Sequence, residues 1–342
     1  MNASTSQTQE IPPQAVIIQM AFGFILSQAL SVAARLKIAD ILAGGPKSVE
    51  EIAKEASAHA PSVYRLMRAL AKAGVFVRDG ENRFLNTPLS EFLRSDHPDS
   101  MRGMVHMICD KEHWLAQGNL EHSVRTGECG FQDTFGKPIF DYYAEHPEPA
   151  KVFDEAMTSL STTVGAAVAE TYDFSGYSKI ADIGGGHGIL LSSVLKANPD
   201  AKGILFDQQY VVNGAEAPAR SGVANRVETV GGNFFEDVPV KADVYLMKHI
   251  IHDWNDKESV RILSNVAQNA PERARLLLVE SVVEDDDVPS LSGLMDLNML
   301  AMTTGRERTT AEYSDLLTAS GWQLERVIPT PSPMQIVEAV KA

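Results

Sequence analysis

The chain contains 342 residues, of which 44% are hydrophobic and 22% are charged, and its formal net charge is −15. This length is sufficient for two globular domains, each with a substantial core of its own. The acidic balance argues against nucleic acid as the main partner, because proteins that bind nucleic acid are usually basic.

The N-terminal region combines a polar tail with a long uncharged run. Residues 1–10 are polar, lack the basic and apolar parts of a secretory signal, and are expected to be disordered. Residues 11–34 contain no charge and approach the length of a membrane span. Polar side chains interrupt the run, however, and two prolines stand at its head (Pro12, Pro13, Gln14, Gln19, Ser27, Gln28 and Ser31). We therefore expect a helix buried between two subunits of a homodimer, and no membrane partner.

Residues 38–92 have the pattern of short helices followed by a hairpin. Ser48 and Glu51 form a capping box at the start of one helix. Pro61 begins a second helix, which Gly74 ends. The order of these elements predicts a winged helix-turn-helix within an N-terminal domain of residues 1–100.

A hairpin completes that domain, with β runs at residues 75–77 and 83–85 around the turn Asp79-Gly80. A winged helix often reads DNA, but residues 1–100 contain ten basic and ten acidic residues and therefore have no net positive charge. A DNA-binding regulator is kept only as an alternative. Residues 101–172 are expected to form a helical connector that lines a substrate pocket.

Strand and helix patterns alternate after Gly176, which predicts a catalytic domain of residues 173–342 built on a parallel sheet. The expected strands lie near residues 179–183, 202–206, 227–231, 243–248 and 275–281, and residues 322–328 and 334–340 form a terminal antiparallel hairpin. The acidic tract at residues 284–287 is read as a solvated loop. The expected fold class is α/β, with a doubly wound, mostly parallel seven-stranded sheet.

A glycine cluster follows the first of these strands, in the sequence IADIGGGHG of residues 180–188. Glycines at such a turn let a ligand approach bare backbone, and the start of the next helix favours a negative group. Asp207 lies at the end of the next strand, where a carboxylate can hold ribose hydroxyls. A dinucleotide site would need a glycine where Ile189 stands, so the pattern favours S-adenosylmethionine over NAD.

Residues 248–254, KHIIHDW, follow the fourth strand of the sheet and should face the same crevice. His252 can act as a base near neutral pH, whereas His249 is more readily explained as a core residue. A metal site using both histidines would need a regular helix, and this segment bends through Asp253 and Asn255.

No metal is therefore expected. The two cysteines, Cys109 and Cys129, form no C-x-x-C pair, which argues against structural zinc and favours a cytoplasmic location.

These motifs together resemble the small-molecule O-methyltransferases of the caffeate, isoflavone and acetylserotonin type, which include bacterial members acting on polyketides and phenazines. The resemblance covers nearly the whole chain. It rests on six segments in order: Asp182–Gly188, Phe206-Asp207, Gly231–Phe234, Met247–Trp254, Glu280 and Gly305–Thr309.

The resemblance implies a set of contacts to S-adenosylmethionine. The glycine turn would hold its methionine part and Asp207 its ribose. The full set that the resemblance implies is Asp182, Gly184, Gly186, Asp207, Gly232, Asn233, Phe234, Lys248, Trp254 and Ser161. Asn233 departs from the aspartate commonly found there, which leaves its contact to adenine in doubt.

The resemblance also implies that His252 removes a proton from the substrate while Glu280 and Glu307 orient it. A phenol has a pKa near 10, so a positioned base should assist the in-line methyl transfer. Adaptable methionines would form the walls of the substrate pocket, with Asp253 beside the base: Met104, Met107, Met157, Met299 and Met302. The expected activity is methylation of a hydroxyl on a small aromatic substrate. The alternatives are a hydroxylase, or an N- or C-methyltransferase on the same scaffold.

Overall fold

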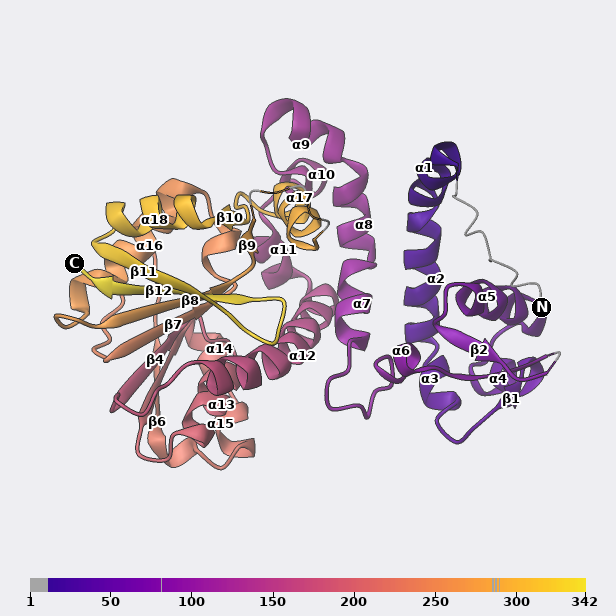
Figure 1. Cartoon of the computed structure of the whole chain (residues 1–342), viewed down its shortest axis with the longest axis horizontal. Coiled ribbons are helices and arrows are strands. Elements are labelled where there is room, and N and C mark those ends of the chain that lie inside the picture. The colour runs from indigo at the N-terminus through magenta and orange to yellow at the C-terminus, as the bar shows by residue number, and fades with distance from the viewer. Residues whose placement is uncertain (1–11, 81, 285, 287, 289) are drawn as a thin grey trace, which may run out of the picture. The chain divides into compact units, whose positions relative to one another are not determined.

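The computed structural model describes residues 12–80, 82–284, 286, 288 and 290–342. The chain forms two compact units that meet in sequence at Cys109 and Asp110 (Figure 1). The expected disordered tail at residues 1–10 lies outside the described residues, as do residues 285 and 287 of the expected acidic loop.

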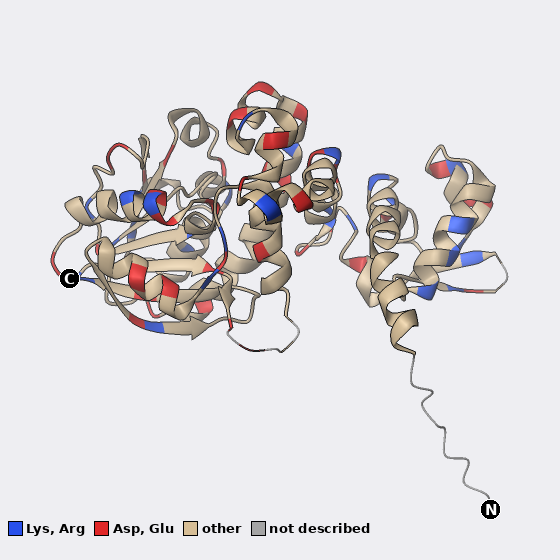
Figure 2. Cartoon of the chain, turned by 90° about the horizontal axis from the view of Figure 1, so that it is seen from above, with Lys and Arg blue, Asp and Glu red and all other residues tan. Residues whose placement is uncertain are grey.

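The uncharged N-terminal run forms two helices where one was predicted, α1 (Pro13–Ala21) and α2 (Gly23–Arg35), bent by 41°. The break lies before Gly23, a poor helix former. No single described helix is long and apolar enough to cross a membrane, and only this bent pair passes the test of length and composition jointly. Figure 2 shows the helix that follows the N-terminal tail as an uncharged segment.

The apolar side chains of α1 and the first half of α2 are largely exposed within the N-terminal unit. None of the residues of α1 is buried. The exposed large side chains are Ile17, Ile18, Met20, Phe22, Phe24, Ile25, Leu26 and Val32. Such a continuous apolar surface is unusual on a monomer and marks a surface of interaction.

The helices and hairpin expected for residues 48–86 are confirmed. They are α4 (Val49–Glu55), α5 (Ala60–Lys72), β2 (Phe76–Arg78) and β3 (Arg83–Asn86). The short helix α3 (Ile38–Ile41) precedes them, and α6 (Pro88–Glu91) and α7 (Arg102–Ile108) follow. The capping box is present, because the Glu51 N–H donates to Ser48 Oγ at 3.2 Å and the Ser48 N–H to Glu51 Oε2 at 2.7 Å. A two-residue strand that was not predicted, β1 (Lys47–Ser48), pairs with β3.

The C-terminal unit begins with a group of helices: α8 (Lys111–Gly118), α9 (Leu120–Thr126), α10 (Gly130–Phe135), α11 (Ile139–Glu145) and α12 (Pro147–Thr171). They share a small core with α17 (Ser292–Met302), in which Phe131, Ile139 and Met302 are buried together.

The seven-stranded sheet is confirmed, with strand order β11-β12-β8-β7-β4-β5-β6. Its strands are β4 (Lys179–Ile183), β5 (Lys202–Asp207), β6 (Val227–Gly231), β7 (Val244–Lys248), β8 (Arg275–Glu280), β11 (Trp322–Pro329) and β12 (Gln335–Lys341). The first five are parallel, and the terminal hairpin is antiparallel.

Both faces of this sheet are buried, so alternate residues of a strand belong to different cores. Leu276 and Leu278 pack on one face and Leu277 on the other. The first face is covered by α16 (Asp256–Asn269) and α18 (Thr310–Ala319), and the second by α12 and α13 (Ile189–Ala197) (Figure 1). The remaining helices are α14 (Gln209–Asn213), α15 (Ala217–Arg220), η1 (Ala224–Arg226) and η2 (Ile251–Asp253).

Strand order reverses at β4, because the chain continues from it to β5 and β6 on one side and later returns to β7 on the other. In open α/β sheets, ligands bind outside the carboxyl ends of the strands at such a reversal. The glycine turn follows β4 and the His252 segment follows β7, so the fold brings both to this position.

Candidate active site

The glycine turn has a backbone that other residues would not adopt. Gly184, Gly186 and Gly188 have φ of +70°, +57° and +81°, values that L side chains rarely take. A Cβ on Gly184 would lie 2.5 Å from Ile250 Cδ1. The N–H of Gly184 donates to Phe206 O at 2.8 Å, which fixes the turn against the end of β5.

Two carboxylates flank this turn. The Gly186 N–H donates to Asp207 Oδ2 at 2.8 Å, and the Gln208 N–H to Asp207 Oδ1 at 2.7 Å. Asp182 is 1% exposed, and its Oδ2 has no hydrogen-bond partner among the described residues. Burial raises the pKa of Asp182 to about 7, although the Lys248 ammonium opposes the rise. The same burial lowers the pKa of Lys248.

The buried free oxygen of Asp182 is an acceptor that a ligand would satisfy, since such atoms rarely remain unpaired in proteins. Together with the bare backbone of the glycine turn, it fits the ammonium and carboxylate of an amino-acid group. The residues present therefore fit S-adenosylmethionine.

The loop of Gly232, Asn233 and Phe234, which is predicted to contact the adenine of the cofactor, lies beside Trp254. A Cβ on Gly232 would be 2.7 Å from Phe206 Cε2. The Phe234 and Trp254 rings meet edge to face with centroids 6.2 Å apart. Asn233 is exposed, and its Oδ1 accepts the Phe235 N–H at 3.0 Å, so the amide stabilises its own turn.

His252 lies in η2, directly after β7, and is 5% exposed. Its Nδ1 is 2.9 Å from Glu307 Oε1, and its Nε2 is 3.7 Å from Asp253 Oδ1. Glu280 Oε1 accepts the N–H groups of Ile250 at 3.2 Å and Ile251 at 3.0 Å. The structure thus brings together the three residues predicted to be catalytic.

The three carboxylates around His252 determine its charge. Burial alone would lower the pKa of the imidazole, but Asp253, Glu280 and Glu307 outweigh burial and raise it to about 9. Burial raises the pKa of Glu280 to about 7 and that of Asp253 to about 6, with the charge of His252 opposing both. The ring is therefore protonated more readily than an exposed histidine.

His252, Glu280 and Glu307 offer ligand types that a metal would accept, with one atom of each within 4.8 Å of the others. Their arrangement needs no ion to explain it, because His252 and Glu307 share a direct hydrogen bond. The second histidine considered for a metal site has another partner, because His249 Nε2 lies 2.9 Å from Met334 Sδ. The nearby Asp256 pairs with Arg308.

Sequence reasoning missed the residue that holds the His252 segment in place. Arg308 is fully buried, and it donates to the carbonyl oxygens of Ile251 at 2.9 Å and Trp254 at 2.8 Å. It also contacts Asp256 Oδ1 at 2.9 Å. The motif Gly305–Thr309 drew attention to this segment, but nothing in the sequence indicates that the arginine turns inward.

The segment that carries Glu307 is held in place at two points. The Glu307 N–H donates to Asp296 Oδ1 at 3.0 Å. Gly305 lies so close to the His252 segment that a Cβ there would be 1.9 Å from His252 O. Residues 305–309 and 251–256 therefore pack closely through their backbones, and the ion pair of Arg308 with Asp256 joins the two segments.

The predicted pocket methionines are distributed over both units. Met157 and Ser161 are half-buried on α12, and Met299 and Met302 are buried on α17. Met104, like Met107, is buried on α7 of the N-terminal unit. Their contacts with a substrate stay predictions.

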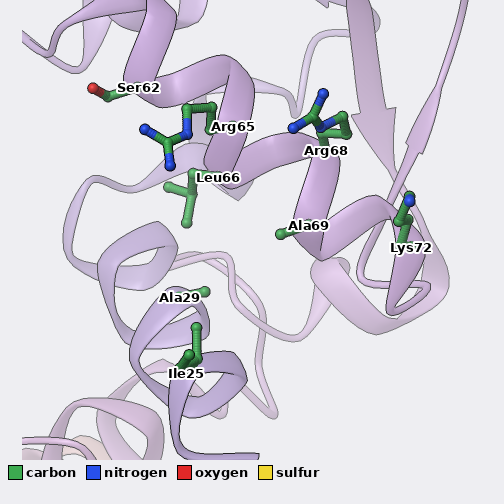
Figure 3. A pocket seen from close by; sticks show the side chains of 8 residues that line it. All are labelled: Ile25, Ala29, Ser62, Arg65, Leu66, Arg68, Ala69 and Lys72. Carbon is green, nitrogen blue, oxygen red and sulfur yellow. The ribbon is translucent and has the colours of Figure 1, made fainter. Parts of the chain in front are cut away.

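A hollow in the N-terminal unit lies between α2 and α5 (Figure 3). Leu66 of α5 faces Ala29 of α2 across it. The residues that line it are Ile25, Ala29, Ser62, Arg65, Leu66, Arg68, Ala69 and Lys72. None of the predicted cofactor or substrate residues is among them, so this hollow is distinct from the crevice of the sheet.

Comparison with known sequences finds two matches to family descriptions. Residues 117–323 match the O-methyltransferase domain and residues 18–96 the O-methyltransferase dimerisation domain. The phenazine O-methyltransferase PhzM of Lysobacter antibioticus is 42% identical over 330 residues, 96% of each chain. The 8-amino-8-demethylriboflavin N,N-dimethyltransferase of Streptomyces davaonensis is 34% identical over 315 residues, 90% of each chain.

Solved structures are similar over nearly the whole length. CalO1, a methyltransferase of calicheamicin biosynthesis in its SAH-bound form, has a TM-score of 0.88 at 34% identity, covering 98% of this chain and 100% of that one. Human N-acetylserotonin methyltransferase in complex with SAM has a TM-score of 0.89 at 27% identity, covering 98% and 99%.

Proposed function

The chain belongs to the O-methyltransferase family, and we propose that it methylates a hydroxyl group of a small aromatic metabolite with His252 as the general base. It is an S-adenosylmethionine-dependent methyltransferase, as its relatives are. The cofactor supplies an electrophilic methyl group on a positively charged sulfur.

Several residues are placed to hold that cofactor. Asp182, Lys248 and the glycine turn, whose backbone carries no side chains, would bind its amino-acid part, and Asp207 its ribose. Phe234 and Trp254 offer aromatic surfaces for its base. Ser161, on α12, is assigned to the same site.

The hydrogen bond between His252 Nδ1 and Glu307 Oε1 carries the proposal. A carboxylate only accepts hydrogen bonds, so Nδ1 must hold the proton of a neutral imidazole. The lone pair is then on Nε2, which has no carboxylate within normal hydrogen-bond distance, since Asp253 Oδ1 is 3.7 Å away. This is the arrangement in which a histidine removes a proton through Nε2 while an acid steadies its charged form.

The pKa of His252 also matches the proposed substrate. At about 9, it lies close to the value of about 10 for a phenol. Proton transfer between groups of similar pKa has little thermodynamic cost. Glu280 stabilises the backbone of the same segment by accepting two N–H groups.

The proposal can be tested by incubating the purified protein with S-adenosylmethionine and matched pairs of aromatic acceptors that differ only in carrying a hydroxyl or an amino group. We expect mass spectrometry to find a methyl ether of at least one hydroxyl compound, and about 10²- to 10⁴-fold less of it in the same time when His252→Ala replaces the native chain at neutral pH. Methylation of the amines alone would contradict the proposal and favour the N-methyltransferase alternative.

A further inference from the structure

His249 lies at a corner of the backbone that builds the site. Its N–H still donates to Val279 O in the sheet at 3.2 Å, but its φ is +52°, in the left-handed region. Few residues other than glycine adopt this conformation. The corner turns the chain so that the next two N–H groups, of Ile250 and Ile251, reach Glu280.

The side chain of His249 lies against the proposed base. Its ring stacks on that of His252, with centroids 4.6 Å apart and planes inclined by 24°. The Nε2 of His249 lies 2.9 Å from Met334 Sδ, in the connection between β11 and β12. His249 is 8% exposed, so water does not compete for either contact.

One hydrogen bond does not fix an imidazole, because the second side-chain torsion of histidine is broad and the ring can tilt about a single N···O axis. In His252, Glu307 holds the Nδ1 edge and His249 covers one face of the ring. An edge contact and a face contact together set the direction in which Nε2 points.

We propose that His249 is a positioning residue for the base, its ring lying against the face of His252 so that Nε2 keeps a fixed direction toward the acceptor. This inference rests on the proposed function. His249 suits the task because it does not compete for the proton. Burial lowers its pKa far below 6.5, and the charges of His252 and Lys248 lower it further.

Two substitutions separate the ring from the backbone corner. His249→Asn removes the ring, and asparagine tolerates the left-handed conformation. His249→Phe keeps a flat ring and loses the nitrogen, while Met334→Leu removes the sulfur contact and keeps His249. Each variant is first checked for thermal unfolding and for binding of S-adenosylhomocysteine.

We expect His249→Asn to lower kcat about 10- to 100-fold with little change in KM for the cofactor, since small misplacements of a reacting group cost rate at this scale. His249→Phe should restore kcat to within about threefold of the native value, as should Met334→Leu, because a ring still covers His252. A folded His249→Asn variant with native kcat would overturn the inference, as would a His249→Phe variant that unfolds at the native temperature, and so carries no added backbone strain, but is as slow as His249→Asn.

A measurement without substrate keeps this test independent of the proposed function. Nitrogen relaxation of selectively labelled histidines reports how freely the ring of His252 reorients, while the Glu307 hydrogen bond is present in every variant. In the native protein we expect one ordered ring orientation, and in His249→Asn a ring that reorients between several. An equally ordered ring in a folded His249→Asn variant would refute the positioning role even if no acceptor were methylated, whereas a native protein that has the ordered ring and methylates no hydroxyl would refute only the proposed function.

Discussion

His252 is surrounded by more negative charge than a single histidine balances. Glu280, Glu307 and Asp253 all act on it, and two of these acids have pKa values that burial raises toward neutrality. The cluster therefore stabilises the protonated imidazole, the form that His252 reaches when it takes the proton of the acceptor. Three predictions follow from this balance and from the carboxylate at the glycine turn.

His252→Ala should keep its affinity for S-adenosylhomocysteine and lose about 10²- to 10⁴-fold in kcat, the usual range for a positioned proton acceptor. The loss should shrink as the pH approaches the pKa of the phenol, where the substrate arrives already ionised. Steady-state kinetics with phenols of different acidity checks this. Native turnover in a folded variant would leave proximity as the source of catalysis.

The pH profile should show His252 directly. A base with a pKa of about 9 is mostly protonated at pH 7, so kcat/KM should rise with pH, reach half its plateau near pH 9 and level off above that pH. Glu307→Gln removes one charge that raises this pKa, so the rising limb should move to lower pH while the plateau falls, because the imidazolium is less stabilised. A limb that stays in place would exclude Glu307 from the electrostatics of the base.

Asp207→Ala should weaken binding of S-adenosylhomocysteine by about 1–3 kcal/mol, the cost of leaving buried polar partners unpaired. The variant also loses the acceptor of the Gly186 N–H. Calorimetry measures the change, with Asp200→Ala as the control, because Asp200 is an exposed aspartate at the opposite end of β5. Equal affinity in the native and Asp207→Ala proteins would be inconsistent with a ribose contact.

Among the elements, the strands of the sheet were the most predictable from sequence. The central strands are buried on both faces and read as apolar runs that end at glycine or aspartate, as β4 and β5 do. The two-residue strands β1, β9 (Val282–Val283) and β10 (Arg308–Thr309) were missed, because pairs so short exist only through contacts distant in sequence.

The candidate site, like the sheet, was predictable from the sequence only in part. The segment of His252 could be assigned to the carboxyl edge of the sheet from topology, because it follows a strand, whereas the roles of Glu280 and Glu307 came from the resemblance to the O-methyltransferases. The inward turn of Arg308 and the stacking of His249 could not be predicted, since both depend on how separate loops fit together. The single helix expected for residues 11–34 was wrong, because the helix breaks before Gly23 and the run forms two helices.

Gly305 provides a test of that fit between loops. A methyl group there would meet the backbone of His252 and Asp253, which cannot move aside cheaply. Gly305→Ala should therefore lower kcat by at least tenfold and destabilise the protein by about 1–3 kcal/mol, the usual cost of overpacking. Gly293→Ala, with open space around the added carbon, is the matched control. Native kinetics and unfolding in Gly305→Ala would show that the loops are not closely fitted.

At the scale of the whole molecule, the exposed apolar side chains of α1 and α2 call for a partner. Residues 18–96 match a dimerisation domain, and we propose that a second copy of the chain covers these helices. A charge in this surface should then cost far more than a charge elsewhere, because burial of an unpaired charge is strongly unfavourable.

Ile18→Asp with Phe24→Asp should yield monomers or insoluble protein at micromolar concentration by light scattering. Val124→Asp is the control, because Val124 is similarly exposed but lies on α9, outside the matched dimerisation domain. Monomeric native protein would contradict the proposed dimer, as would a doubly substituted protein that remains dimeric.

The carboxyl edge of the sheet carries the glycine turn, Asp207, His252 and Glu280, whereas the half-buried side chains of α12 and the buried ones of α17 belong to helices packed beside it. The reactive machinery and the walls assigned to the acceptor are thus encoded by separate stretches of the gene. We expect mutations at Met157, Met299 and Met302 to alter the acceptor repertoire over evolutionary time. Ser161 on α12 and Asp296 on α17 connect the same two helices to the proposed cofactor site and to Glu307, so a lineage with this layout can diversify its products as long as those two positions are kept.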